Sequence, residues 1–497
     1  MRSSLFAFLL PLSLVALAPA CGTSDDASFL VIVDTDLPTP EVASRLRVDA
    51  YTEAGVWFDS REVDTSRPES FPVSFGVAKR GPVRLRIRVF PAGHTREYRG
   101  ERFQDWPDVL AKPAPEVPGN APRLTVDGAD RTPEVEPLPS VTVDRLVRVD
   151  TGQGVRAVVR LRGACAGMMA NLQTLESCAE TSRRREPLVT APSDGGGAGI
   201  ESQSKSMREP CAESDSTPAR ACVPGGAFVM GEAKNTLDYP GDSFLQLRAE
   251  RVVRVHRFFV DRHEITVGRY RKAAAAGFKP ARFSPAENDG PWVARPADRT
   301  ACTYSAADMG RENYGLSCAS WVTFREFCNY QKGELATEAQ WEYVARQAGG
   351  DVERRFPWGD DEPVCEDVVL GRLKDGGCDA VKMTGDALAV VDAAGNPTHP
   401  SDATPLGVYD MVGGLSEYVL DNPAEYDEAC FAGSPLDNVH CGDVYPLPSA
   451  GDSPDIRRVA RGGSWVSPPL VSRSTARQKA PLAAPFYGAR CVYPAKE

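Results

Sequence analysis

The distribution of cysteine constrains the fold of this chain more than any other feature. Removing Cys21, which belongs to the leader, from the thirteen cysteines leaves an even twelve. Ten of these form couples of sequence neighbours: Cys165 with Cys178, Cys211 with Cys222, Cys302 with Cys318, Cys365 with Cys378, and Cys430 with Cys441. The remaining two, Cys328 and Cys491, lie far apart. No Cys-x-x-Cys pair occurs and the chain has only 5 histidines, so the pattern favours disulfides over zinc.

The N-terminus has the composition of an export signal. Arg2 is followed by an apolar run from Leu5 to Leu17, which is too short to span a bilayer as a resident helix. The run closes with Ala18-Pro-Ala-Cys21, and small residues directly before a cysteine are typical of a bacterial lipoprotein signal. We therefore expect an exported protein that is lipid-anchored through Cys21 in the bacterial cell envelope, at the outer membrane. Ala18 replaces the more usual Leu, so an ordinary secretory signal is the alternative.

Export makes disulfides the expected state of the remaining cysteines. The formal net charge is -11, and no basic run is longer than Arg183–Arg185. Nucleic-acid binding needs clustered Lys and Arg to neutralise phosphates, so this composition argues against a nucleic-acid partner.

The N-terminal third is predicted to be all-β. In the clearest run, Val83–Val89, valine, leucine and isoleucine alternate with arginine, which predicts one face toward a core and the arginines toward water. Similar short runs, separated by Pro- and Gly-rich turns, follow one another without helices: 29–33, 46–51, 71–78, 141–149 and 155–161. The pattern predicts a small β-sandwich over residues 27–162, with no evident chemistry, acting as a spacer or a binding module.

Residues 163–222 shift to Ser, Arg, Gly and Pro and are predicted to be a linker. A weak signal for a helix lies within it, around Met168 to Cys178, and stronger helix signals follow in a third region that we place at 223–494. Thr266 is expected to cap a helix that ends at Gly277, and Ser320 a second one. Thr337 and Gln340 form a capping box at the start of a third helix.

Several motifs of this third region occur in a family-specific order. They are Ser320-Trp321, Phe327-Cys328, the helix within Leu335–Arg346, Phe356-Pro-Trp-Gly359, Tyr409-Asp-Met-Val-Gly413 and Arg461-Gly-Gly-Ser-Trp465. In this order, from about Val223 to Tyr493, they resemble the formylglycine-generating enzymes, also called sulfatase-modifying factors. The resemblance implies a mixed α/β fold related to C-type lectins, with little regular secondary structure. It also implies that Cys328 pairs with Cys491.

The chemistry that the resemblance implies lacks its ligands in this chain. Active members of the family hold copper between two cysteines just after the Gly-Gly-Ser motif and oxidise a substrate cysteine with oxygen. Ser467 and Ser472 stand at these two positions, and a serine hydroxyl ligates Cu(I) poorly because Cu(I) prefers soft thiolates. Ser464 of the motif itself lacks the Gly-x-Ser-x-Gly context of a nucleophilic serine. We therefore expect no bound copper.

Calcium is the other metal that the resemblance implies. The family's structural calcium uses main-chain carbonyls and an acidic side chain on the turn that matches Gly413-Gly-Leu-Ser-Glu417, so Glu417 is the candidate ligand. Gly414 and Tyr418 depart from the family's usual Asn and Trp, and a single carboxylate is a weak site for a hard cation.

Two classes of function follow. The first is a non-catalytic envelope lipoprotein that binds a peptide, protein or glycan in the family's substrate groove, with Trp465, Arg473 and Arg477 as lining residues. The second is a copper- and oxygen-dependent oxidase that acts on protein cysteine. The missing thiolate pair favours the binding protein over the enzyme.

Overall fold

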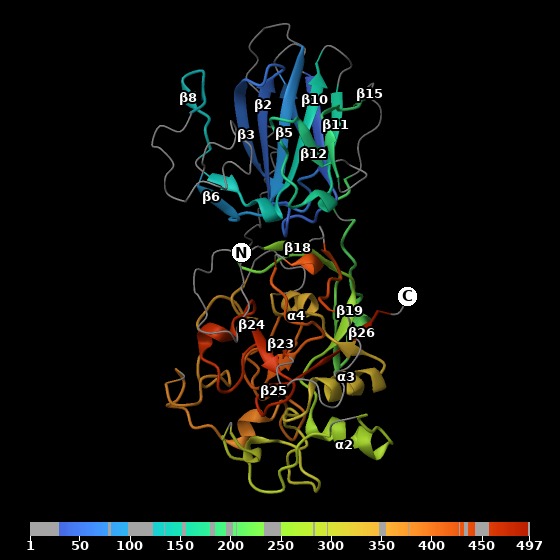
Figure 1. The fold of residues 1–497 in the computed structure, drawn as a ribbon, viewed down its shortest axis with the longest axis vertical. Helices are drawn as coiled ribbons and strands as arrows, with labels where there is room; N and C mark the ends of the chain where they lie inside the picture. Colours follow the sequence, from blue (N-terminus) through green and yellow to red (C-terminus); the bar gives the residue numbers. More distant parts are fainter. Residues whose placement is uncertain are drawn as a thin grey trace, which may run out of the picture.

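The computed structural model describes the chain between Phe29 and residue 495 as two β-rich bodies, one above the other in Figure 1. Cys21 lies outside the described residues. The description omits the segments 1–28, 78–80, 98–122, 134, 152–155, 179–183, 195–201, 205, 233–249, 282–283, 296, 347–353, 376, 427, 432–435, 443–456 and 496–497. Among the described residues, no helix combines the length and apolarity required to cross a bilayer.

The upper body is a β-sandwich, as the sequence predicts. Its first sheet has four strands, in the order β15 (Ser193–Asp194), β11 (Arg156–Leu161), β1 (Phe29–Thr35) and β4 (Val73–Val77). Its second sheet has five, in the order β14 (Val189–Thr190), β10 (Val143–Asp150), β5 (Pro82–Phe90), β2 (Arg45–Thr52) and β3 (Trp57–Asp64). Three small hairpins flank the sheets: β6 (Thr95–Glu97) with β9 (Val135–Pro137), β7 (Thr125–Val126) with β8 (Ala129–Asp130), and β12 (Glu176–Cys178) with β13 (Arg185–Pro187).

Two predictions for this body are wrong. The sandwich does not end at residue 162, because β14 pairs with β10 and β15 pairs with β11, so much of the predicted linker belongs to the sheets. Strands of two residues carry no periodicity that a sequence could reveal. The arginines of β5 also do not all face water: Arg86 and Arg88 are buried, the first with Asp144 and the second with Asp49 and Glu136.

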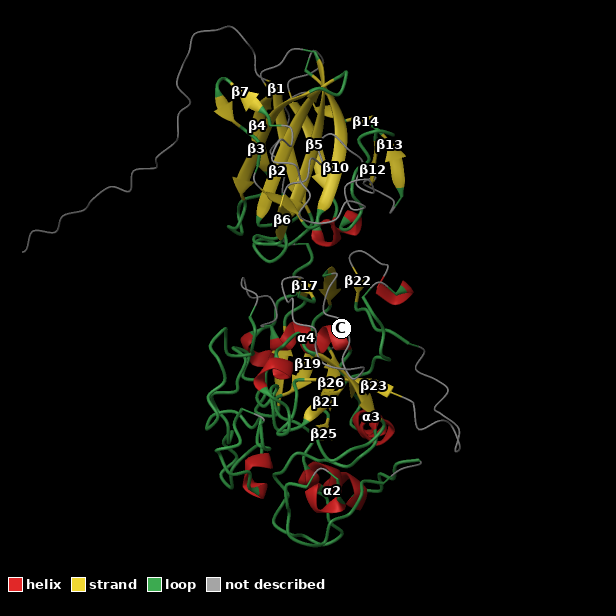
Figure 2. Cartoon of the chain, turned by 60° about the vertical axis from the view of Figure 1, so that its left-hand side comes forward, coloured by secondary structure: helices red, strands yellow, loops and turns green. Residues whose placement is uncertain are grey.

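The lower body has the predicted mixed α/β character with little regular structure (Figure 2). One sheet has the order β16 (Arg220–Val223), β19 (Phe258–Asp261), β26 (Cys491–Pro494) and β20 (Glu334–Leu335). A second has β17 (Gly226–Met230), β18 (Arg251–Val255) and β22 (Leu436–Asp437). The third has β24 (Arg477–Pro481), β23 (Arg457–Arg461), β21 (Ser416–Tyr418) and β25 (Tyr487–Gly488).

Among the described residues of this body there are three α-helices: α2 (Val267–Ala275), α3 (Trp321–Tyr330) and α4 (Glu338–Ala345). Each begins at the predicted cap, because the side chains of Thr266, Ser320 and Thr337 accept hydrogen bonds from amides three residues on. The Gln340 side chain accepts in turn from the Thr337 amide at 2.9 Å, which confirms the capping box. The short polar side chains satisfy helix N–H groups that have no intrahelical partner.

All six predicted disulfides are confirmed. Five close short loops, and the sixth joins Cys328 of α3 to Cys491 of β26 across 163 residues. This long-range bond fixes α3 against the sheet that contains the last strand of the domain. Ser474, which precedes β24, donates to the Ala345 carbonyl at the end of α4 at 3.4 Å.

Candidate functional site

The Arg461-Gly-Gly-Ser-Trp465 motif turns the chain sharply at the end of β23. Gly462 and Gly463 both have φ in the left-handed region, at 85° and 68°. A Cβ on Gly463 would lie 2.2 Å from the Ser472 hydroxyl, and one on Gly462 would lie 2.3 Å from the Met411 carbonyl. Only glycine fits both positions, so the motif brings the turn and Ser472 into close contact.

The three candidate serines lie around this turn. The Ser464 amide donates to Ser467 Oγ at 2.9 Å, and the two hydroxyl oxygens are 3.4 Å apart. Ser472 is fully buried and its hydroxyl donates to the Pro468 carbonyl at 3.1 Å. Each hydroxyl therefore already takes part in a hydrogen bond that holds the turn.

These residues do not fit a copper ion. Cu(I) prefers soft thiolate ligands, whereas Ser467 and Ser472 provide neutral hydroxyls that are engaged with backbone groups. The twelve cysteines that the structure describes are all joined in disulfides, so none of them supplies a replacement thiolate.

A cavity of about 550 Å³ lies beside the turn. Ser464 and Ser467 form part of its wall, together with residues from β23, from the segment that follows the turn, from β24, and from β25 and the residue before it: Arg457, Val466, Pro468, Val471, Gln478, Lys479, Pro481, Phe486 and Tyr487. Arg457 is exposed, and Lys479 is about one-third exposed and lies 3.9 Å from Glu425. The wall thus combines two cations, hydroxyls and two aromatic rings.

The predicted lining residues are placed differently. Trp465 and Arg477 are 0% exposed, so neither lines the cavity, and Arg473 lies near Glu232 at 3.6 Å and is largely buried. Arg477 is turned inward by Glu338 of α4, whose carboxylate accepts from its Nε at 2.6 Å and its Nη2 at 2.8 Å. The prediction failed because this partner lies far away in sequence, on α4.

The cations that line the cavity, Arg457 and Lys479, were not predicted from the sequence. Arg457 of β23 pairs with Pro481 of β24, and Lys479 pairs with Val459. The two cations are therefore diagonal neighbours on adjacent strands. Alternation does not single them out, because Arg477 and Lys479 share one face of β24, yet Arg477 is fully buried and Lys479 is about one-third exposed.

Beneath the turn lies a buried ionic cluster. Glu338 and Glu342 of α4 bind Arg461 and Arg477, and all four side chains are at most 1% exposed. Burial would raise the pKa of Glu338, but Arg477 and Arg461 outweigh it and lower that pKa. Arg461 also donates to the carbonyls of Ser474 and Thr475 at 3.0 Å each. The arginine of the motif therefore fixes the strand that follows the serine turn.

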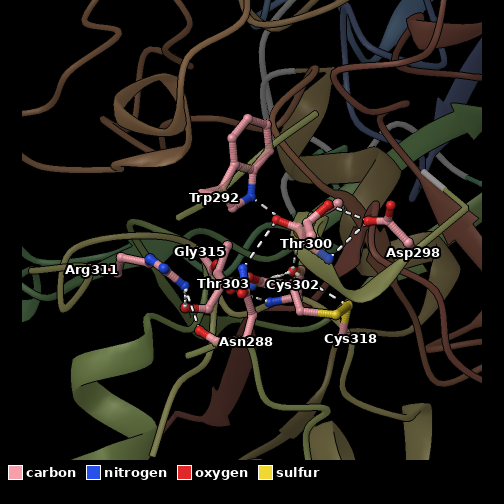
Figure 3. The surroundings of a disulfide bond; sticks show 11 residues. Asn288, Trp292, Asp298, Thr300, Cys302, Thr303, Arg311, Gly315 and Cys318 are labelled. Atoms are coloured by element: carbon pink, nitrogen blue, oxygen red, sulfur yellow. Dashed lines mark hydrogen bonds between the residues drawn. A yellow bond between two sulfur atoms is a disulfide. The ribbon is translucent and has the colours of Figure 1, made fainter. Parts of the chain in front are cut away.

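The other side of the turn packs against a disulfide-bonded loop, whose surroundings, including Trp292, Cys302 and Cys318, are drawn in Figure 3. Trp465 packs against Trp292 with ring centroids 5.7 Å apart, and the Trp292 indole donates to the Ala301 carbonyl at 3.1 Å. Cys302, the next residue, is bonded to Cys318. The disulfide thus stabilises the loop against which Trp465 of the motif packs.

The predicted calcium ligand is engaged elsewhere. Glu417 is 1% exposed, and both of its carboxylate oxygens accept from Arg490 Nε at 2.8 Å. Trp341 donates to it as well, at 2.8 Å. A calcium ion needs free oxygen ligands, whereas this carboxylate is neutralised and saturated by protein donors. Glu417 does not fit calcium in this arrangement.

Fold and site together define the class of this domain. It is a small α/β domain with little regular structure, in which two glycines shape a serine-containing turn beside a cavity. The chain belongs to the sulfatase-modifying factor enzyme 1-like domain family, which matches residues 205–495. The match starts earlier than the predicted boundary at 223, because β16 already belongs to this domain.

A curated relative is the formylglycine-generating enzyme of Streptomyces coelicolor, which is 29% identical over 175 residues. These cover 31% of this chain and 54% of the relative, so the chain spans about half the length of that protein. Among solved structures, PvdO from Pseudomonas aeruginosa is 20% identical with a TM-score of 0.39, covering 56% of this chain and 94% of PvdO. Treponema denticola variable protein 1 is 16% identical with a TM-score of 0.31, covering 56% and 100%.

Proposed function

We propose that residues 205–495 form a non-catalytic binding domain, whose ligand occupies the cavity beside Ser464 and Ser467. The observation that carries this proposal is the pair of engaged hydroxyls at the positions of the copper thiolates. The domain has the serine turn, the ionic cluster and the cavity, but no soft ligands for copper at the turn. It can therefore bind a ligand in the cavity, but it lacks the metal site needed to oxidise a substrate cysteine.

The chemistry of the cavity narrows the ligand. Arg457 and Lys479 line it, whereas no acidic side chain does so among the described residues, in a chain of formal charge -11. Phe486 and Tyr487 offer ring faces, and the serine hydroxyls offer hydrogen bonds. We infer a peptide, protein or glycan ligand that carries negative charge, since its charge would be opposite to that of the lining side chains.

A binding screen of the full-length protein against glycan and acidic-peptide arrays tests the proposal. For a ligand found in the screen, Lys479→Glu should weaken binding about tenfold or more, because it replaces attraction by repulsion within the site. The matched control is Lys272→Glu on α2, which makes the same change of charge at an exposed position away from the cavity. Equal binding by both variants would place the ligand elsewhere.

We also propose that the protein is anchored in the bacterial envelope through a lipid on Cys21, as the leader sequence indicates. Detergent partitioning of the cell-expressed protein measures this directly. The Cys21→Ala variant should appear as a soluble or unprocessed form, and an unchanged, membrane-retained variant would contradict the anchor.

A further inference from the structure

The two sheets of the sandwich are unequal in a way that leaves one strand position open. The first sheet ends at β4, and the second extends one strand further, to β3. Among the described residues, β4 pairs with β1 on one side and has no partner strand on the other. Within the part of the chain that the structure describes, no strand therefore lies opposite the core-facing side of β3.

The uncovered side of β3 carries residues that belong to the inner face. Val63 pairs with Leu46 and Arg61 pairs with Val48, and paired residues point to the same side of an antiparallel sheet. Leu46 and Val48 are core residues, yet Val63 is 40% exposed and the Arg61 side chain is 58% exposed. The difference in exposure between β2 and β3 shows that the inner face of β3 is only partly covered.

An apolar cavity of about 110 Å³ lies at this position. Its lining comes from both sheets: Leu46, Val48 and Ala50 of β2, Phe58, Asp59, Arg61 and Val63 of β3, Phe75, Gly76 and Val77 of β4, and Leu85 of β5. An apolar cavity of about 150 Å³ accommodates a benzene-sized group, so this one suits a single aliphatic side chain.

The width of the slot restricts what fills it. In each copy of the chain, β3 projects one strand beyond β4, so pairing β4 with β4 of a second copy would bring two β3 strands into the same space. A single extended segment meets no such obstacle, and it would equalise the two sheets at five strands each.

We propose that the sandwich is a strand-accepting module, in which an extended segment of another protein pairs with the outer edge of β4. Its main chain bonds to β4, one apolar side chain enters the cavity, and an acidic side chain two residues away pairs with Arg61. At present Arg61 contacts Asp59 of its own strand at 3.0 Å, and its side chain is still 58% exposed and accessible to an incoming carboxylate.

Fluorescent octapeptides test this on the full-length protein. In the probe every second residue is threonine, and leucine and aspartate alternate at the positions between; both orders of leucine and aspartate are tested. The control peptide has serine in place of leucine. The leucine probe should bind and the serine control should bind about tenfold more weakly, since the buried side chain supplies most of the affinity. Hydrogen exchange of the β4 amides should slow when the probe is bound. Absence of binding, or binding without protection of β4, would overturn the proposal.

Two variants define the site. Ala50→Leu fills the cavity and should weaken the leucine probe about tenfold. Arg61→Glu should weaken the aspartate probe and restore binding of a probe with lysine in its place, an exchange that misfolding would not produce. The control Val56→Glu, at an exposed position outside the cavity, should change neither. If the β4 amides of the free protein already exchange as slowly as those of β1, this chain fills its own slot and the proposal fails.

Discussion

At the scale of single residues, the serine turn separates binding from oxidation. Ser467 lines the cavity and Ser472 is buried behind the turn, where Gly463 leaves just enough room for its hydroxyl. The turn geometry depends on the glycines and on Arg461, and none of these needs a metal. The substitution of the thiolates is therefore compatible with an intact turn.

Restoring the thiolates tests whether the ligands alone were lost. The double variant Ser467→Cys with Ser472→Cys should retain Cu(I) against a chelator under reducing conditions, because soft ligands select Cu(I). The unmodified protein should retain none, and it should not convert a cysteine peptide to the aldehyde. Each single variant is the matched control and should bind copper far more weakly. Peptide turnover by the unmodified protein with copper supplied would overturn the non-catalytic proposal.

The residues also show what a sequence can and cannot reveal. Thr337 and Gln340 predict the start of α4 because both partners of the capping box are local. The prediction that Trp465 and Arg477 line a groove fails because these side chains are buried by Trp292 and Glu338. Both partners are remote in sequence, so local patterns do not reveal them. The same holds for Arg88, whose partners Asp49 and Glu136 no periodicity could identify.

At the scale of elements, α4 is fixed at its N-terminus by a buried carboxylate. Asp421 accepts from the Glu338 amide at 2.7 Å and from the Cys441 amide at 2.6 Å, and is 1% exposed. Burial, reinforced by the nearby Glu338 charge, raises the pKa of Asp421 to about 7. The element that supports the ionic cluster thus begins at a group that titrates near neutrality.

The raised pKa of Asp421 predicts a pH dependence of stability. The native state holds this proton up to about pH 7, whereas the unfolded chain releases it near the ordinary value of 3.8. Between these values the native state binds more protons, so the free energy of unfolding should fall as pH rises, by about 1.4 kcal/mol for each pH unit. Urea unfolding from pH 4.5 to 7.5 measures the slope. Asp421→Asn, which does not ionise, should flatten it, and an unchanged slope would contradict the assignment.

At the scale of the whole molecule, the two bodies share a hydrophobic core. Ala227, Val229 and Val252, from β17 and β18 of the lower body, belong to the same buried cluster as the sandwich. Arg208 and Glu41 form an ion pair at 2.8 Å across the same boundary. Interfaces between independent domains are usually more polar, so we expect this shared apolar core to hold the sandwich in a fixed position on the family domain. A strand bound at β4 and a ligand bound near Ser467 would then be presented at a fixed separation.

A double-mutant cycle measures this connection. Val252 of β18 lies in the shared core, whereas its neighbour Val253 lies in the core of the lower body alone, and both are at most 1% exposed. The partner in both cycles is Val141, a fully buried member of the shared core on the sandwich side, in a turn that β18 contacts. Each single change to alanine should cost about 2 kcal/mol of unfolding free energy.

Contacting residues show coupling energies of at least about 0.5 kcal/mol, and separated ones add within about 0.3 kcal/mol. The pair Val252→Ala with Val141→Ala should therefore be non-additive, because removal of one methyl pair lets the other side relax into the space. The pair Val253→Ala with Val141→Ala should be additive, because the second valine faces away from the sandwich. Additivity in both cycles would mean that the two bodies only touch, and the fixed separation between the strand slot and the serine cavity would no longer follow.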